Sequence, residues 1–356
     1  MARVTLQTIA ERLGVSRMTV SNAFSRPDQL SEELRTRILS TAQELGYVGP
    51  DPAGRALARG TSGAVGVLLT DSLRIAFTDQ VATEFLGAIV DELAPTGLAL
   101  TLLTAYGKGD VVPARDVAMD GALVYSCDIA SQSREWLMRR KLPVVFVDQE
   151  PERDNSSVNV DDRGGARAAA QHLVDLGHRE VGIINSAETG EVELVDDPMR
   201  DATAYPSRQR MLGWLDALGP AGIVPTVAQA PKLAADGAGE VAAALLLEAS
   251  PRPTAILCFS DVLALGVVIT ARRLGLAVPQ DLSVVGFDDT LAARFSDPPL
   301  TTVRQDVDAK GRTAAAALVD AIESARVGVP ATPEHHVLPT ELVVRSSTAR
   351  PHVRAE

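Results

Sequence analysis

The stretch GVSRMTVSNAF, residues 14–24, decides the fold of the N-terminal part of the chain. Gly14 ends one segment of helical periodicity, and Ser16 is a side chain that caps the helix that follows. Three apolar side chains of this second helix recur at helical spacing and form its inward face: Val20, Ala23 and Phe24. The remaining side chains face outward: Arg17, Met18, Ser21 and Asn22.

Helices are predicted on both sides of this stretch. The first begins after Thr5, and its inward positions are apolar: Leu6, Ile9, Ala10 and Leu13. The third begins after Ser31 and ends at Gly46, with another apolar face: Leu34, Ile38, Ala42 and Leu45. Two helices joined by a tight glycine-containing turn and supported by a third make a helix-turn-helix unit.

The outward side chains of the second helix suit the major groove of DNA. Arg17 can give paired hydrogen bonds to guanine, Asn22 can bind adenine, and Met18 can contact a thymine methyl group. Residues 1–60 hold eight Arg against six Asp or Glu, whereas the whole chain has a formal net charge of −12. A basic head on an acidic body favours DNA binding. The residues alone leave a second interpretation open, a plain three-helix bundle with a solvated face.

The rest of the composition narrows the class of protein. No apolar run is long enough to span a bilayer, and the first residues lack a signal-peptide core, so we expect a cytoplasmic, nucleoid-associated protein without membrane contact. Cys127 and Cys258 lie far apart without metal-ligand spacing, and we expect neither a disulfide, a metal nor a cofactor. The chain also lacks GxSxG and P-loop motifs, which argues against an enzyme.

From residue 61 onward, apolar strands alternate with helices. The predicted strands are AVGVLL, LALTLL, GALVY, PVVFVD, VGIIN, TAILCF and LSVVGFDD. This alternation predicts parallel, doubly wound sheets with helices on both faces. Ligands of such sheets bind beyond the carboxyl ends of the strands, where the sequence places polar residues: Asp71, Asp148, Asn185, Ser260, Asp261 and Asp288. Carboxylates converging with a guanidinium such as that of Arg210 suit a polyol.

Two long stretches of the head resemble the N-terminal domain of the LacI/GalR (lactose repressor) family. They are VTLQTIAERLGVSRMTVSNAF, residues 4–24, and LSEELRTRILSTAQELGYV, residues 30–48. The resemblance implies that Arg17, Met18 and Asn22 contact bases, with Ser21 nearer the DNA backbone. Many family members have Arg at the position of Asn22, so their operator sequence does not carry over to this chain.

The segment GPDPAGRALARG, residues 49–60, joins the head to the body. A helix this short is unstable by itself in water, so the segment alone reads as a flexible linker. The resemblance implies a hinge helix that forms on the operator and inserts Leu57 into the minor groove, where an apolar wedge bends DNA. Gly54 stands where the family usually has alanine.

Several stretches of the body resemble the family's effector-binding core. They are VDDRGGARAAAQHLVDLGHREVGII, SRQRMLGWLDAL, ILCFSDVLALG, VVGFDDT and PPLTTVRQD. The resemblance implies a periplasmic-binding-protein-like pair of lobes joined by three crossovers. By motif position, Asp148, Arg210 and Asp288 hold the effector, and Ser260 stands where sugar-binding relatives often have Asn.

These observations predict an all-α helix-turn-helix head and an α/β core of two doubly wound lobes. The expected boundaries are 1–48 for the head, 49–60 for the hinge and 61–345 for the core. Within the core we expect an N-lobe at about 61–148 plus 304–328, and a C-lobe at about 160–287 plus 333–345.

The predicted function is that of a homodimeric transcriptional repressor. It would bind a near-palindromic operator, with its affinity switched by a small molecule, a carbohydrate or carbohydrate-like compound, in the inter-lobe cleft. Whether the effector releases or strengthens DNA binding stays open. Two alternatives also stay open: a soluble sugar- or nucleoside-binding protein whose head has lost DNA function, and an enzyme on a Rossmann-like scaffold.

Overall fold

The computed structural model divides the chain into two compact units, residues 1–63 and 64–356, called here the head and the core. The residues it describes are 4–49, 51, 54, 56, 60–69, 73–104, 111–125, 131–187, 190–200, 202–231, 237–329 and 331–352, apart from the side chains of Pro27 and Ile75. Leu57, Asp71 and Cys127, which the sequence singled out, lie outside the described residues.

The head contains the three predicted helices: α1 (Leu6–Leu13), α2 (Arg17–Ser25) and α3 (Glu32–Glu44), with a short 3-10 turn η1 (Pro27–Gln29) between the last two. The predicted caps are confirmed. The hydroxyl of Ser16 accepts a hydrogen bond from the amide of Thr19 at 3.0 Å. Gly14 adopts a φ of 67°, a left-handed conformation that glycine enters without strain, and this lets the chain turn from α1 into α2.

Apolar side chains from all three helices meet in one small core. The fully buried members are Ile9, Ala10, Val20, Ala23, Ile38 and Ala42. Phe24, at the end of α2, packs edge-on against Tyr47 with ring centroids 5.7 Å apart. The predicted inward faces are therefore confirmed, and the polar side chains of α2 lie on the side away from this small core.

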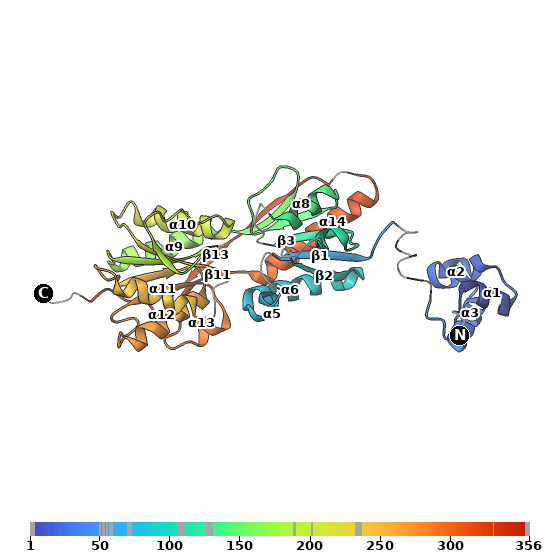
Figure 1. Ribbon diagram of the computed structural model, residues 1–356, viewed down its shortest axis with the longest axis horizontal. Coiled ribbons are helices and arrows are strands. Elements are labelled where there is room, and N and C mark those ends of the chain that lie inside the picture. The colour runs from blue at the N-terminus through green and yellow to red at the C-terminus, as the bar shows by residue number, and fades with distance from the viewer. Residues whose placement is uncertain are drawn as a thin grey trace. The chain divides into compact units, whose positions relative to one another are not determined.

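Two sheets organise the core (Figure 1). Sheet A has the strand order β12-β5-β4-β3-β1-β2, and all of its strands are parallel. Its strands are β1 (Ala64–Leu69), β2 (Ala99–Thr104), β3 (Gly121–Tyr125), β4 (Val144–Val147), β5 (Ser156–Val160) and β12 (His335–Leu338). We call the part of the core built on sheet A the N-lobe.

Sheet B has the order β13-β11-β10-β9-β6-β8-β7 and is parallel except at its two edge strands. Its strands are β6 (Val181–Ala187), β7 (Glu193–Val195), β8 (Thr226–Pro231), β9 (Ala255–Cys258), β10 (Ser283–Asp288), β11 (Thr301–Gln305) and β13 (Thr340–Val343). We call the part built on sheet B the C-lobe. The edge strand β7 lies in the acidic segment between β6 and α10.

Helices cover both faces of each sheet, as doubly wound folds require. On sheet A, α6 (Gln80–Leu93) and α14 (Val307–Arg326) pack on one face, and α7 (Pro113–Asp116) and α8 (Gln132–Arg139) on the other. On sheet B, α9 (Asp162–Leu176) and α10 (Tyr205–Leu218) lie above in Figure 1, with α11 (Ala238–Glu248) and α12 (Asp261–Arg273) below. The short helices are α5 (Ile75–Thr78), η2 (Ala94–Thr96) and α13 (Leu291–Phe295).

The chain crosses between the lobes three times: from β5 into α9, from β11 into α14, and from β12 into β13. Two expected boundaries differ from this arrangement. The segment 333–345 was expected in the C-lobe, but β12 pairs with β5 in sheet A, because the third crossing falls at Pro339 inside that segment. The C-lobe also extends past residue 287, since β11 belongs to sheet B.

Candidate functional site

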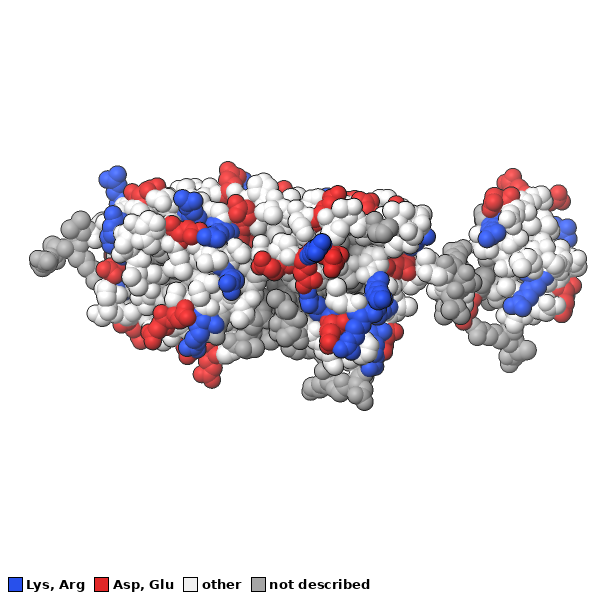
Figure 2. Space-filling model, turned by 90° about the horizontal axis from the view of Figure 1, so that it is seen from above, with Lys and Arg blue, Asp and Glu red and all other residues white. Residues whose placement is uncertain are grey.

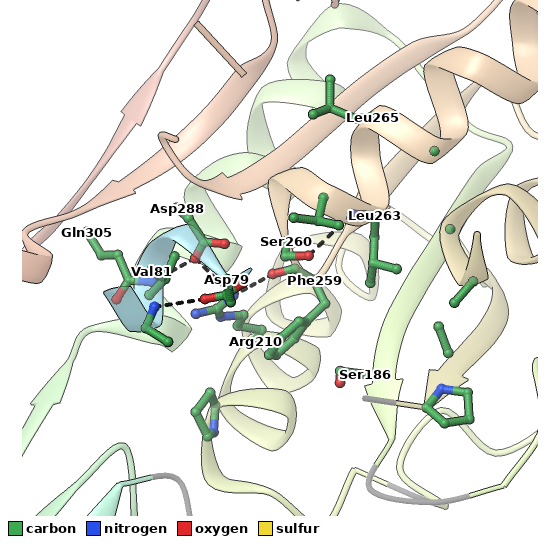
Figure 3. Close-up of a pocket in the computed structure, with 18 of the residues that line it drawn as sticks. Asp79, Val81, Ser186, Arg210, Phe259, Ser260, Leu263, Leu265, Asp288 and Gln305 are labelled. Carbon is green, nitrogen blue, oxygen red and sulfur yellow. Dashed lines mark hydrogen bonds and ion pairs between the residues drawn. The ribbon is translucent and has the colours of Figure 1, made fainter. Parts of the chain in front are cut away.

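A cavity of about 570 Å³ lies where strand ends of the two sheets face each other, and all four predicted effector residues line it. Asp148 comes from the N-lobe, whereas Arg210, Ser260 and Asp288 come from the C-lobe. Figure 3 shows Arg210, Asp288 and Ser260 converging on one space with Asp79 of the opposite lobe. The structure thus brings together side chains that are 140 residues apart in the sequence.

Arg210 is the most constrained of these side chains. It projects from α10 and is 4% exposed, with its Nε 2.7 Å from Oδ1 of Asp162. Its Nη1 donates to the backbone carbonyl of Phe259 and lies 3.8 Å from Oδ1 of Asp288. The guanidinium carbon sits 3.5 Å from the ring centroid of Phe287. Two carboxylates and an aromatic face therefore fix the guanidinium plane.

Asp288 lies at the end of β10 with a φ of 117°, a left-handed conformation that is strained for a residue with a side chain. Its Oδ1 accepts a hydrogen bond from Nε2 of Gln305 at 2.7 Å. Burial raises the pKa of Asp288 to about 8, although the nearby Arg210 guanidinium opposes the rise. Strained backbone and a perturbed carboxyl in a cavity are typical of functional sites.

Two buried aspartates hold the backbone that carries Asp288. Asp261 accepts hydrogen bonds from the Thr302 hydroxyl at 2.6 Å and from the Thr290 amide at 2.7 Å. Asp289 has a fully buried carboxylate that pairs with three arginines: Arg294, Arg304 and Arg345. These bonds connect β10, β11, α12 and α13. They explain how the strained conformation at Asp288 persists.

Asp148, at the end of β4, faces a lysine that the sequence analysis missed. Nζ of Lys310 lies 2.7 Å from Oδ2 of Asp148 and 3.0 Å from Oε1 of Gln305. Lys310 is only 1% exposed, and a buried ammonium requires such partners. Because Gln305 also bonds Asp288, a continuous polar chain runs from Asp148 in the N-lobe to Asp288 in the C-lobe.

The cavity also has apolar and aromatic walls, formed by Val81, Ala82, Tyr125, Phe259 and Leu263 among others. Ser260 lines the cavity, but its Oγ accepts a hydrogen bond from the Leu263 amide at 3.3 Å as the cap of α12. The hydroxyl hydrogen of Ser260 stays available to a ligand.

Five polar residues that line the cavity were not singled out from the sequence: Asp79, Ser186, Glu240, Gln305 and Lys310. Lys310 carried the clearest signal. It shares the buried face of α14 with Val307, Gly311 and Ala314, so a charged residue occupies a position of the apolar stripe. A lysine at such a position predicts a buried carboxylate partner. The sequence does not say that the partner is Asp148.

The head presents the predicted DNA-facing residues on the polar side of α2. Arg17 is exposed and the Met18 side chain is 68% exposed, whereas Ser21 and Asn22 are partly covered. Nδ2 of Asn22 donates to Oε1 of Gln29 at 3.1 Å. This bond orients the Asn22 amide before any base is bound.

Comparisons with known proteins agree with both units. Residues 5–49 match the bacterial regulatory proteins of the lacI family, and residues 170–348 match the periplasmic binding protein-like domain. An HTH-type transcriptional regulator of Mycobacterium tuberculosis is 38% identical over 363 residues, which cover 98% of each chain.

Two solved structures cover nearly the whole chain. The transcriptional regulator CelR in complex with cellobiose has a TM-score of 0.69 at 27% identity, over 97% of this chain and 100% of that one. The Lac repressor dimer bound to operator and the anti-inducer ONPF has a TM-score of 0.75 at 25% identity, over 98% of this chain and 100% of that one.

The fold and the cleft define a DNA-binding transcriptional regulator with a periplasmic-binding-protein-like effector domain. The chain belongs to the lacI family of bacterial regulatory proteins. The predicted family and fold class are confirmed, and the alternative of an enzyme is set aside because the relatives are transcriptional regulators. No helix in the described part of the chain is long and apolar enough to cross a membrane.

Proposed function

We propose that this protein is a cytoplasmic, nucleoid-associated repressor that binds a near-palindromic operator as a homodimer and is switched by a sugar-like molecule in the inter-lobe cleft. The observation that carries the proposal is the convergence of Asp148, Arg210 and Asp288 on one cavity in a chain with a helix-turn-helix head. A carboxylate accepts hydrogen bonds from adjacent hydroxyls, and a guanidinium donates to them. The cellobiose complex of CelR supports a carbohydrate effector.

The DNA side of the proposal rests on α2 and the hinge. Arg17, Met18 and Asn22 would contact bases, and Ser21 would lie nearer the DNA backbone. On the face visible in Figure 2, acidic and basic side chains of the core lie intermixed, so that face offers no continuous basic surface for DNA. We assign the specific contacts to the head and to Leu57 of the hinge.

Exposed apolar side chains on the core support a homodimer. Phe295 on α13 is 84% exposed and Leu291 on the same helix is also exposed. Phe77 on α5 is exposed as well, whereas the exposed Val262 of α12 lines the effector cavity. Clusters of large apolar side chains at a surface mark interaction sites. The Lac repressor structure, which is a dimer on operator, is consistent with a second copy covering this surface.

A gel shift with DNA upstream of the protein's own gene tests the proposal. We expect a specific complex at low salt whose affinity changes when the effector is added. The direction of that change separates an induced repressor from one that needs a corepressor. The absence of any complex, with or without metabolites, would instead support a binding protein without DNA function.

Leu57→Ala tests the hinge separately. We expect it to weaken binding to the specific operator while ligand binding by the core stays unchanged, because only the DNA-bound wedge is removed. Equal operator affinity of the variant and the unmodified chain would remove Leu57 from the proposal. Light scattering of the full chain measures the dimer independently of DNA.

A further inference from the structure

Among the described residues that line the cleft, two are cations, Arg210 and Lys310, and both are already bonded to carboxylates. The Lys310 ammonium has Oδ2 of Asp148 at 2.7 Å. The Arg210 guanidinium has Oδ1 of Asp162 at 2.7 Å and Oδ1 of Asp288 at 3.8 Å. All of these side chains are at most 8% exposed, so water screens their charges poorly. The charge of each cation is therefore already balanced by a carboxylate.

Carboxylates outnumber cations at this site. Asp79 lines the same cavity and uses Oδ1 to cap α6, at 2.8 Å from the Ala82 amide. Among the described residues, Asp79, Asp148 and Asp162 thus face two cations, and Asp288, whose pKa is raised to about 8 by burial, is mostly protonated near neutral pH. A phosphate or carboxylate group would add negative charge beside carboxylates that already balance both cations. Like charges that are close together in a poorly solvated site repel strongly.

The polar atoms of the cleft that have no hydrogen-bond partner suit the hydroxyl groups of a ligand instead. Within the described residues, Oδ1 of Asp148 is buried without a hydrogen-bond partner. Lys310 uses two of its three N–H donors, on Asp148 and Gln305. On the opposite lobe, Nη2 of Arg210 and Oδ2 of Asp288 make no hydrogen bond to a described residue. Each lobe therefore offers one acceptor beside one donor.

We propose that the cleft selects an uncharged polyhydroxylated ligand and excludes its phosphorylated and carboxylated forms. The Lys310–Asp148 pair holds hydroxyls from the N-lobe, and the Arg210–Asp288 pair holds hydroxyls from the C-lobe. A hydroxyl matches each pair because it donates and accepts at once. Lys310 is the specificity-determining residue of the N-lobe half. This inference rests on the proposed function, which places the effector in this cleft.

Calorimetric titration of the full chain with matched compounds tests the selectivity. The probes are ribose and ribose 5-phosphate, glucose, glucose 6-phosphate and gluconate, and cellobiose. We expect an uncharged member to bind, and its phosphorylated partner to bind about 100-fold more weakly or worse, since like charges in a desolvated site cost several kcal/mol. Tighter binding of a phosphorylated or carboxylated member would overturn the proposal.

Asp148→Asn tests the role of the Lys310 pair. The amide removes one negative charge and leaves the Lys310 ammonium unpaired, so the preference for the uncharged member should fall about tenfold or more. Glu84→Gln is the matched control, because it makes the same charge change at an exposed position of α6 outside this cavity, and it should leave the preference unchanged. An unchanged preference in Asp148→Asn would overturn the role of Lys310.

The outcomes separate this inference from the proposed function. Selective binding of an anionic probe that also changes operator affinity would overturn the charge selectivity and leave the proposed function intact. A chain that binds operator but no uncharged probe at millimolar concentrations would overturn the polyol assignment. A chain that binds an uncharged probe but no DNA would support the selectivity and overturn the proposed repressor.

Discussion

Arg210 donates from Nε to Oδ1 of Asp162 across 2.7 Å, and the two side chains are 5% and 0% exposed. This pair joins α10 to the first turn of α9 beneath the cleft. Burial raises the pKa of Asp162 to about 6, and the Arg210 charge opposes that rise. Arg210 thus has a structural partner below the cavity and a second carboxylate, Asp288, inside it.

Arg210→Met should abolish the response to effector and destabilise the core. Removing the guanidinium leaves Asp162 buried without its ion pair, which costs about 3–5 kcal/mol in the free energy of unfolding. Urea unfolding followed by tryptophan fluorescence measures the loss. Arg163→Met is the control: Arg163 pairs with Asp216 on the surface of the same two helices, and its removal should cost far less, because water screens this pair. Equal losses in the two variants would contradict the assignment.

Asp288 should make the protein less stable as the pH rises. Its pKa is about 8 in the folded protein and near 3.8 in the unfolded chain, so the folded state binds the extra proton between these values. The stabilisation is complete below the unfolded pKa and is lost as the pH passes through about 8. Asp162, with a pKa of about 6, contributes mainly below pH 6.

Unfolding free energies at pH 6.5 and pH 8 isolate this effect. The free energy of unfolding should fall over that interval in the unmodified protein and should not fall in Asp288→Asn, which cannot titrate at this position. A fall of the same size in the variant would show that another group is responsible. The ionic strength is held constant, because salt changes the interaction of Asp288 with Arg210.

Gly286→Ala should disturb the buried contacts that support the site. A methyl group at this position of β10 would collide with the buried carboxylate of Asp261, which holds Thr290 and Thr302 in place. We expect a destabilisation of about 1–3 kcal/mol and weaker ligand binding. Gly87→Ala is the opposite case, because nothing lies within 4 Å of the new methyl group in α6. That variant should gain about 0.5–1 kcal/mol, and a loss there would contradict the packing described.

Asn22→Ala should change which bases the head distinguishes. If the Asn22 amide contacts a base, the variant should lose about 1–3 kcal/mol of discrimination at one position of each operator half-site. Anisotropy titrations with single-base variants of a bound operator fragment measure this. Arg37→Ala, an exposed residue of α3, serves as the control and should leave the base preference unchanged. The same preference in Asn22→Ala would exclude base contact by Asn22.

The fold was predictable from the sequence where short-range signals were strong. Thr5, Ser16 and Ser31 cap the helices as predicted, and the apolar stretches before Asp148 and Asp288 form buried strands. The assignment of residues 335–338 to the C-lobe was wrong, because the pairing of β12 with β5 depends on strands far away in the sequence. Strands of four residues, such as β12 and β13, are too short to show a clear periodicity of their own.

The cleft was predictable only in part. Asp148, Arg210, Ser260 and Asp288 follow strands or a recognisable helix, and the structure places all four at one cavity. Lys310 was missed because its partner lies 162 residues away, a distance that no local pattern spans. The bonds of Asp261 and Asp289 that support Asp288 were also missed, since they depend on contacts among β10, β11 and α13.

The most direct test of the account is the operator affinity of the full chain with and without a saturating cleft ligand. We expect the operator affinity of the unmodified protein to change by about 5- to 150-fold, the usual range of coupling between two sites. We expect no change in Arg210→Met, whose operator affinity without ligand should match that of the unmodified chain. The same operator affinity with the cleft filled and empty in the unmodified protein would contradict the account.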